Sequence, residues 1–192
     1  LDHVHGYRTV GGVEYPTHLG IRTTPAEKIG MDSFFDGDQY RIRVTGEMRQ
    51  AEIFGENMIL RRTVETVYGS NEILFHDEIE NQGFKPEPLC FLYHCNAGYP
   101  FLTPESRLIL PEVSCIPRDG EAQKGMAGRL SMGQAEDGQA EQVFQYSLAS
   151  DREGNTFGAF VNDDRELALC IRWNVKKIPL MAQWKSCASG DY

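Results

Sequence analysis

The sequence predicts an all-β protein, and three observations support this fold class. From residue 39 onward the hydrophobic period is two, because the apolar residues Tyr40, Ile42 and Val44 are separated by polar ones. Turns rich in Gly, Asn and Asp follow at roughly ten-residue spacing, which is typical of strands joined by hairpins. No stretch has the apolar stripe of an amphipathic helix of three turns. The sequence therefore predicts an antiparallel meander with one continuous core.

The expected strands fall into two groups. The first group covers residues 39–50, 58–68, 72–80 and 91–100, and turns are expected at 55–57, 69–71 and 81–83. A short apolar run at 108–110 is cut by Pro111. The second group covers residues 142–148, 156–161, 167–173 and 180–184, with a hairpin turn at 162–164. Residues 117–140 contain little apolar sequence and are expected to form a long surface loop. The prediction is a single β-sandwich domain over residues 1–192.

Composition and charge exclude several function classes. Hydrophobic residues make up 41% of the 192 residues and charged residues 24%, which is ordinary for a soluble globular protein. The net charge of -9 argues against nucleic acid or an anionic membrane as a partner. No apolar run approaches the roughly 20 residues of a membrane-spanning helix. The five cysteines are odd in number and form no CxxC pair, which indicates reduced thiols in a cytoplasmic protein and no zinc–thiolate site.

The run Phe91–Pro100 carries the main candidate site. It begins as an apolar, aromatic strand and ends at Gly98 and Pro100, which do not suit the centre of a strand. Alternation along a strand places His94 and Asn96 on the same face. A titratable imidazole beside a neutral amide at a strand end predicts a small polar site. The alternative is a histidine hydrogen-bonded to a backbone carbonyl inside an ordinary sheet.

Two other histidine patterns have simpler interpretations. His3 and His5 have a spacing that places both imidazoles on one face of a strand, a geometry that metals use. No carboxylate or third histidine follows closely, so two polar loop histidines are the favoured interpretation, and no metal site is predicted. His76 and Asp77 are interpreted as structural polar residues paired across strands.

Several blocks resemble a known family. They are Gly46–Ala51 (GEMRQA), Phe54–Asn57 (FGEN), Asp77–Phe84 (DEIENQGF) and Tyr93–Pro100 (YHCNAGYP). In this order they resemble an uncharacterised branch of the aldose 1-epimerase (galactose mutarotase-like) superfamily, and the resemblance covers nearly the whole chain. It implies an antiparallel β-supersandwich with the sugar site in a cleft. The chain resembles the interior of a longer domain of this kind, truncated at both ends.

The resemblance also implies roles for individual residues. In the family a general acid protonates the ring oxygen of a sugar while a general base deprotonates the anomeric hydroxyl. His94 corresponds to the catalytic histidine, and a histidine suits this role because imidazoles titrate near neutrality. The implied substrate-binding residues are His18, Arg22, Asn96, Glu141 and Gln183, and Trp184 is a candidate to stack on a sugar ring. The branch reads His-Gly-Arg where this chain has His18-Leu19-Gly20, so Arg22 is the nearest arginine.

One departure concerns the base. The family's catalytic glutamate would follow Tyr192, and its opening strands, with a substrate-binding arginine, would precede Leu1. The sequence as given therefore lacks the expected base. The expected function is interconversion of sugar anomers without a cofactor, acting on a small-molecule sugar. The first alternative is a non-catalytic carbohydrate-binding protein that uses the same cleft. The second is a metal-dependent sugar isomerase of cupin type built on His3, His5 and a further histidine.

Overall fold

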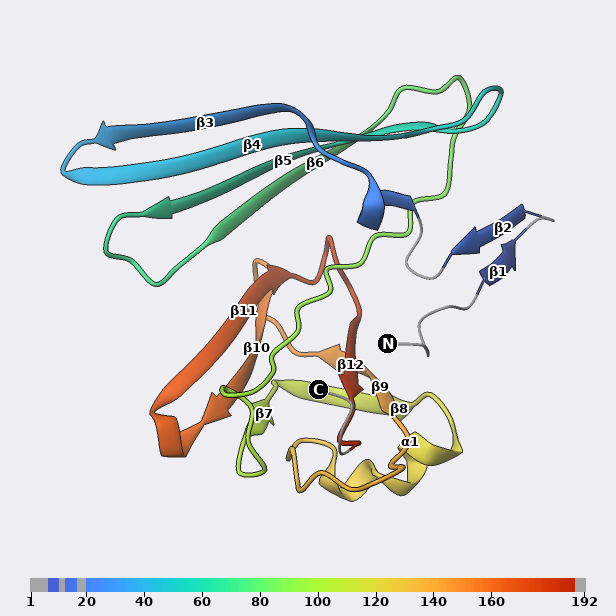
Figure 1. The fold of residues 1–192 in the computed structure, drawn as a ribbon, viewed down its shortest axis with the longest axis vertical. Helices are drawn as coiled ribbons and strands as arrows, with labels where there is room; N and C mark the ends of the chain where they lie inside the picture. Colours follow the sequence, from blue (N-terminus) through green and yellow to red (C-terminus); the bar gives the residue numbers. More distant parts are fainter. Residues whose placement is uncertain (1–6, 11–12, 17–19, 189–192) are drawn as a thin grey trace. The chain divides into compact units, whose positions relative to one another are not determined.

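The computed structural model describes residues 7–10, 13–16 and 20–188, and the side chains of residue 21 and of residues 23–188. The chain forms two compact units, residues 1–92 and residues 93–192, and each is described by itself. Antiparallel strands are the main secondary structure of both units and helix is scarce (Figure 1), which confirms the all-β prediction. The expectation of a single domain stays a prediction.

The first unit is built around one four-stranded sheet. A hairpin of β1 (Tyr7–Val10) and β2 (Val13–Pro16) and the 3-10 turn η2 (Gly20–Thr23) precede it. The sheet contains β3 (Glu27–Asp36), β4 (Gln39–Ala51), β5 (Asn57–Val67) and β6 (Leu74–Asn81), which lie side by side in chain order (Figure 1). Every strand pairs with its neighbour in sequence, so this part is the predicted meander.

One face of this sheet is mainly apolar. Met31, Val44, Val64 and Phe75 occupy directly opposed positions on the four strands and form a row across the sheet. Arg62 and Asp77 are also directly opposed on this face, and two hydrogen bonds of 2.8 and 2.7 Å join the guanidinium to the carboxylate. This pair confirms the cross-strand pairing predicted for Asp77. His76, for which the same pairing was predicted, lies with its Nε2 3.4 Å from Glu78 on its own strand.

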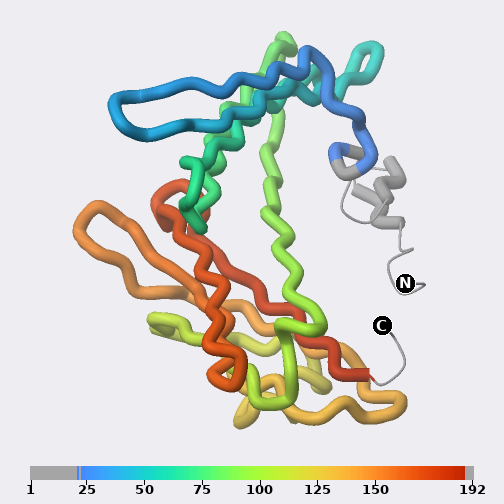
Figure 2. Tube along the Cα trace, turned by 60° about the vertical axis from the view of Figure 1, so that its left-hand side comes forward, coloured from blue at the N-terminus to red at the C-terminus, as the bar shows by residue number. Residues whose placement is uncertain are grey.

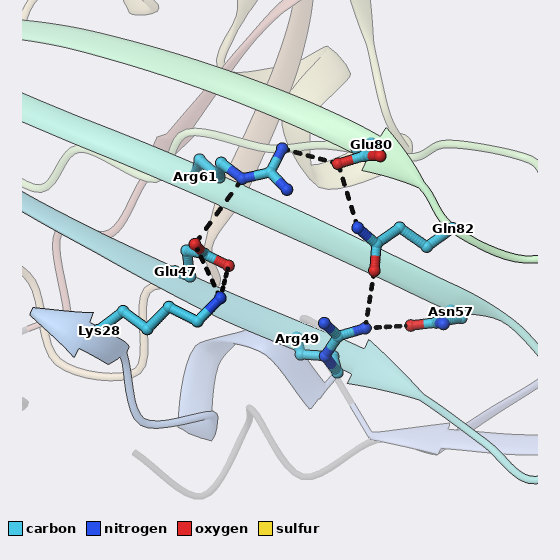
Figure 3. Close-up of polar contacts among 7 residues, drawn as sticks. All are labelled: Lys28, Glu47, Arg49, Asn57, Arg61, Glu80 and Gln82. Atoms are coloured by element: carbon cyan, nitrogen blue, oxygen red, sulfur yellow. Dashed lines mark hydrogen bonds and ion pairs between the residues drawn. The ribbon is translucent and has the colours of Figure 1, made fainter.

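The other face carries a line of ion pairs that crosses all four strands, here called the charge ladder (Figure 3). Glu47 on β4 accepts a hydrogen bond from Lys28 on β3 at 3.1 Å and lies 3.8 Å from Arg61 on β5. Arg61 in turn binds Glu80 on β6 at 2.7 Å. Figure 3 shows that the polar contacts continue through Gln82 to Arg49 and Asn57. The alternating charges of these strands thus form an internally paired, solvated face.

The second unit contains two three-stranded antiparallel sheets. In the first, β10 (Asn155–Asn162) lies between β11 (Leu167–Asn174) and β7 (Arg107–Ile109). In the second, β9 (Gln142–Leu148) lies between β12 (Met181–Lys185) and β8 (Glu112–Pro117). The 3-10 turn η4 (Asp163–Arg165) joins β10 to β11 at the predicted hairpin, and the Asn162 side chain accepts a hydrogen bond from the Arg165 backbone.

The core of this unit lies against one face of the β12–β9–β8 sheet. Phe144 and Tyr146 of β9 are buried there together with Ala122. Ala122 belongs to the helix α1 (Gly120–Lys124), which is followed by the 3-10 turn η3 (Met126–Gly128). This helix corrects the prediction that residues 117–140 are entirely loop. Asp119 caps it by accepting a hydrogen bond from the Ala122 backbone N–H at 2.9 Å, and Ala122 is small enough to be fully buried.

The strand predicted through His94 is a second correction. Residues 86–98 are assigned to no helix or strand, and Figure 2 shows the drawn-out course of this segment in light green. Pro86, Pro88 and Pro100 lack the backbone N–H that a strand ladder needs. Among the described residues, no strand pairs with this segment. In the same ranges, no helix has the length and apolar character needed to cross a membrane.

Candidate functional site

The β12–β9–β8 sheet has two chemically different faces. Alternation along the strands directs Phe144, Tyr146 and Gln183 to the buried side. Ile116, Val143 and Trp184 occupy the alternate positions and define what is here called the open face. The Ile116 side chain is 63% exposed and Trp184 is 44% exposed, so this face presents apolar and aromatic surface.

A carboxylate is fixed above the open face by two donors. Trp184 pairs with Val143 across the sheet, and on the other side of β9 the Arg118 backbone N–H bonds the Val143 carbonyl at 2.9 Å. Glu141 lies two residues before Val143. The Trp184 indole Nε1 donates to Glu141 Oε2 at 2.6 Å, and Arg118 Nη1 lies 3.0 Å from Glu141 Oε1. The two carboxylate oxygens are therefore held by Trp184 of β12 and by Arg118, which immediately follows β8.

Arg118 is held on its other side as well. Its Nε donates to Asp119 Oδ2 at 2.8 Å. The hydrogen bond with Asp119, followed by that with Glu141, raises the pKa of the guanidinium above its ordinary value. The backbone N–H of Ala122 and then the Arg118 side chain lower the pKa of Asp119, so its carboxylate stays charged.

His94 lies next to this arrangement. The centroids of the His94 and Trp184 rings are 6.4 Å apart, with the rings tilted by 60°. His94 is exposed, and it belongs to the extended segment that is part of no sheet. The alternative is therefore wrong in placing His94 inside an ordinary sheet. The structure thus brings together an imidazole, an aromatic ring, a carboxylate and a guanidinium, here called the His94–Trp184 cluster (His94, Trp184, Glu141 and Arg118).

Gln183 adjoins Trp184 in sequence but its side chain lies on the buried face. It is 7% exposed, its Oε1 accepts a hydrogen bond from the Tyr146 hydroxyl at 2.7 Å, and its Nε2 donates to the Arg129 carbonyl at 2.8 Å. Burial raises the pKa of Tyr146, so the phenol stays protonated and donates. This geometry favours a structural role, and sugar contact by Gln183 stays a prediction.

The remaining predicted residues are distributed differently. Asn96 is exposed, two residues after His94. His3, His5 and His18 lie outside the described residues, so the metal hypothesis built on His3 and His5 is untested. Arg22 lies in η2 of the first unit, and its side chain is likewise outside the described part. Over the described ranges, no three His, Cys, Asp or Glu side chains come close enough together to hold a metal ion.

Arg118 is the residue that the sequence interpretation missed. It was included in the expected surface loop because Gly, Gln and acidic residues follow it. A signal was present, since extending the alternation of Ser114 and Ile116 by one step places residue 118 on the same face.

A separate hollow of about 670 Å³ opens at the end of β9 and β12, lined in part by Glu121, Lys124, Gln142 and Lys185. It contains none of the residues of the His94–Trp184 cluster, so it is not the candidate site.

The fold is similar to that of a known protein. Over 96% of this chain it matches the crystal structure of a "putative aldose 1-epimerase" from Klebsiella pneumoniae subsp. pneumoniae, with a TM-score of 0.90 and 24% sequence identity. This match confirms the predicted galactose mutarotase-like fold. The chain spans about half of that protein, 48% of its length.

The family is established by sequence. Residues 1–192 match the family described as Domain of unknown function (DUF4432), and the chain belongs to this family. None of the curated proteins matches the chain.

Proposed function

We propose that the protein is an aldose 1-epimerase-like isomerase that interconverts the two anomers of a small sugar. The observation that carries the proposal is the His94–Trp184 cluster, in which an exposed imidazole and a fixed carboxylate flank one exposed aromatic ring. The likeness in fold to the Klebsiella protein agrees with this reaction.

In the proposed reaction His94 protonates the ring oxygen while a base takes the proton of the anomeric hydroxyl. The bond between C1 and the ring oxygen breaks, and the hydroxyl becomes the aldehyde of the open chain. Rotation about the C1–C2 bond presents the other face of the carbonyl, and the two proton transfers run in reverse to close the ring. One proton enters as one leaves, so the reaction consumes no cofactor. The family resemblance assigns the role of the base to a glutamate.

Two further residues have proposed roles in holding the sugar. Trp184 is 44% exposed and offers an apolar ring on which the C–H face of a pyranose stacks. Glu141 accepts one hydrogen bond at each oxygen, and a carboxylate oxygen accepts about two. Each oxygen therefore retains capacity for a sugar hydroxyl.

The test follows anomer exchange of several aldoses by NMR exchange spectroscopy on the intact protein. We expect faster exchange with the wild type, and a fall of about 10²- to 10⁴-fold in His94→Gln, which removes the general acid. His76→Gln is the matched control, because His76 is also an exposed histidine and its Nε2 lies 3.4 Å from a carboxylate, that of Glu78, outside the cluster. If the wild type accelerates exchange of no aldose, the proposal of an epimerase is refuted.

A non-catalytic carbohydrate-binding protein is the second candidate. The hydrogen bonding of Glu141, the carboxylate of the cluster, favours this candidate. Each of its two oxygens already accepts from a donor, so Glu141 is better suited to bind sugar hydroxyls than to remove a proton. Sugar binding that persists in His94→Gln, without anomer exchange in the wild type, would select this candidate.

A further inference from the structure

We propose that Arg118 is a positioning residue of the candidate site, which fixes the carboxylate of Glu141 and, through it, the indole ring of Trp184. The proposal rests on the proposed function for its effect on sugar, but its structural content can be tested without any turnover.

The first step in the argument is the position of Glu141 in the sheet. It immediately precedes β9, the central strand, while Arg118 immediately follows β8 and Trp184 lies in β12. Arg118, Val143 and Trp184 form a row across the three strands, through one backbone hydrogen bond and one strand pairing. Glu141 spans this row, with Oε1 on Arg118 at 3.0 Å and Oε2 on Trp184 at 2.6 Å. A carboxylate held from both sides has one orientation, whereas a carboxylate held at one oxygen can rotate about the bond that remains.

The second step is that Arg118 is anchored to the core. Its Nε donates to Asp119 Oδ2 at 2.8 Å, while Asp119 Oδ1 accepts the Ala122 backbone N–H at 2.9 Å as the cap of α1. Asp119 cannot turn away from Arg118 without disturbing this cap. Ala122 is fully buried against Phe144 and Tyr146. Contacts therefore run from the buried core through Asp119 and Arg118 to the carboxylate.

The third step concerns what the arrangement does for a ligand. The indole that donates to Glu141 belongs to the ring that lies beside His94, at 6.4 Å between centroids. A fixed Glu141 thus fixes the ring plane on which the sugar would stack and the acceptor for its hydroxyls. Ordering a mobile side chain on binding weakens affinity, and its loss of freedom corresponds to roughly 3- to 10-fold in affinity. Because Glu141 would contact the sugar in the ground state and the transition state alike, this effect belongs to KM and not to kcat.

The first experiment reads the position of the indole directly. The 192 residues contain two tryptophans, Trp173 and Trp184, and their indole N–H signals in the intact protein labelled with ¹⁵N-tryptophan are assigned with Trp173→Phe and Trp184→Phe. We expect Arg118→Met to change the chemical shift of the Trp184 indole signal. The Trp173 signal should keep its chemical shift, because Trp173 Nε1 donates elsewhere, to the Ile178 carbonyl at 3.1 Å. The unmoved Trp173 signal also shows that the variant is folded.

The matched control is Arg107→Met. Arg107 is 45% exposed against 44% for Arg118, and it also holds a carboxylate, that of Asp163, by two contacts of 3.0 and 3.1 Å. We expect it to leave both indole signals in place. Arg118→Lys keeps the charge without the planar fork and is expected to give a partial shift. If Arg118→Met does not fold, the chemical shift of the Trp184 indole signal in Arg118→Lys tests the proposal in its place.

The second experiment measures anomer exchange in the same variants. We expect Arg118→Met to raise KM roughly 3- to 10-fold with kcat retained. A Trp184 signal that does not move in Arg118→Met or Arg118→Lys overturns the proposal, whatever the activity. A fall in kcat with KM unchanged also overturns it. If the wild type shows no exchange, the proposed function fails alone, and the indole signals still decide the role of Arg118.

Discussion

The buried pair of Tyr146 and Gln183 allows a quantitative test of the structural role inferred for Gln183. Tyr146 is 1% exposed and its hydroxyl donates to Gln183 Oε1 at 2.7 Å. Tyr146→Phe removes this donor and leaves a buried amide oxygen without its partner. Such a change costs about 1–3 kcal/mol in the free energy of unfolding, because the lost bond adds to the desolvation of the oxygen that remains. Urea denaturation of the intact protein measures it.

The double-mutant cycle with Gln183→Leu separates the pair from its surroundings. Gln183→Leu also removes the donor to the Arg129 carbonyl, so it should cost at least as much as Tyr146→Phe. The double variant should be less destabilised than the sum of the two, with a coupling of about 1 kcal/mol. Additive effects, or sugar affinity that falls in Gln183→Leu but not in Tyr146→Phe, would refute a purely structural role.

Two further predictions concern the β9–β10 connection and its surroundings. Hydrogen bonds from Asn155, first from its backbone N–H and then from its side chain, lower the pKa of Asp151 in the folded protein. The charged Asp151 carboxylate therefore stabilises the fold at pH values above the pKa that it has in the unfolded chain. This stabilisation is lost as the pH falls through the lower pKa of the folded state. We expect Asp151→Asn to flatten the fall in the free energy of unfolding as the pH is lowered below about 4, the ordinary pKa of an aspartate. Parallel curves for variant and wild type would contradict this. Gly154 has a φ of +99°, and an added Cβ would lie 3.0 Å from Asn174 Oδ1, so Gly154→Ala should cost more than about 1 kcal/mol in urea denaturation. Gly128→Ala, at an ordinary φ with open space around it, is the control and should change little, and equal losses in both variants would be inconsistent with strain at residue 154.

The strands that alternation predicted are those in which local pattern and final pairing agree. The ranges 58–68, 142–148 and 167–173 fall on β5, β9 and β11 to within one residue at each end. Strand β3 was missed for a local reason. Its register shifts between Glu27 and Gly30, and Lys28 adopts a φ of +48°, so the period of two is broken where the strand begins.

The candidate site was only partly predictable, for a related reason. The residue pattern of Phe91–Pro100 indicated His94, and the family resemblance added its catalytic role and Glu141. The geometry first inferred for His94 was a strand end, and that strand is absent. What brings His94 near Trp184 is the course of an extended segment, which alternation does not encode. Arg118 was hidden because its partner Glu141 lies 23 residues further along the chain, across a stretch with no periodic pattern.

The charge ladder of the first unit has a consequence for how its sheet assembles. Because side chains alternate, sliding β5 by a single position against β4 would swing Arg61 onto the apolar side, among Val44 and its neighbours, and break its bonds to Glu47 and Glu80. A misaligned pairing therefore loses these ion pairs and buries a charge. The screening length in water is about 10 Å at 0.1 M salt and about 3 Å at 1 M, so only concentrated salt weakens contacts of 2.7 and 3.8 Å. Refolding in concentrated salt is therefore expected to yield more sheets with a shifted strand register. The folded sheet is held by its backbone hydrogen bonds, so the same salt should destabilise it little.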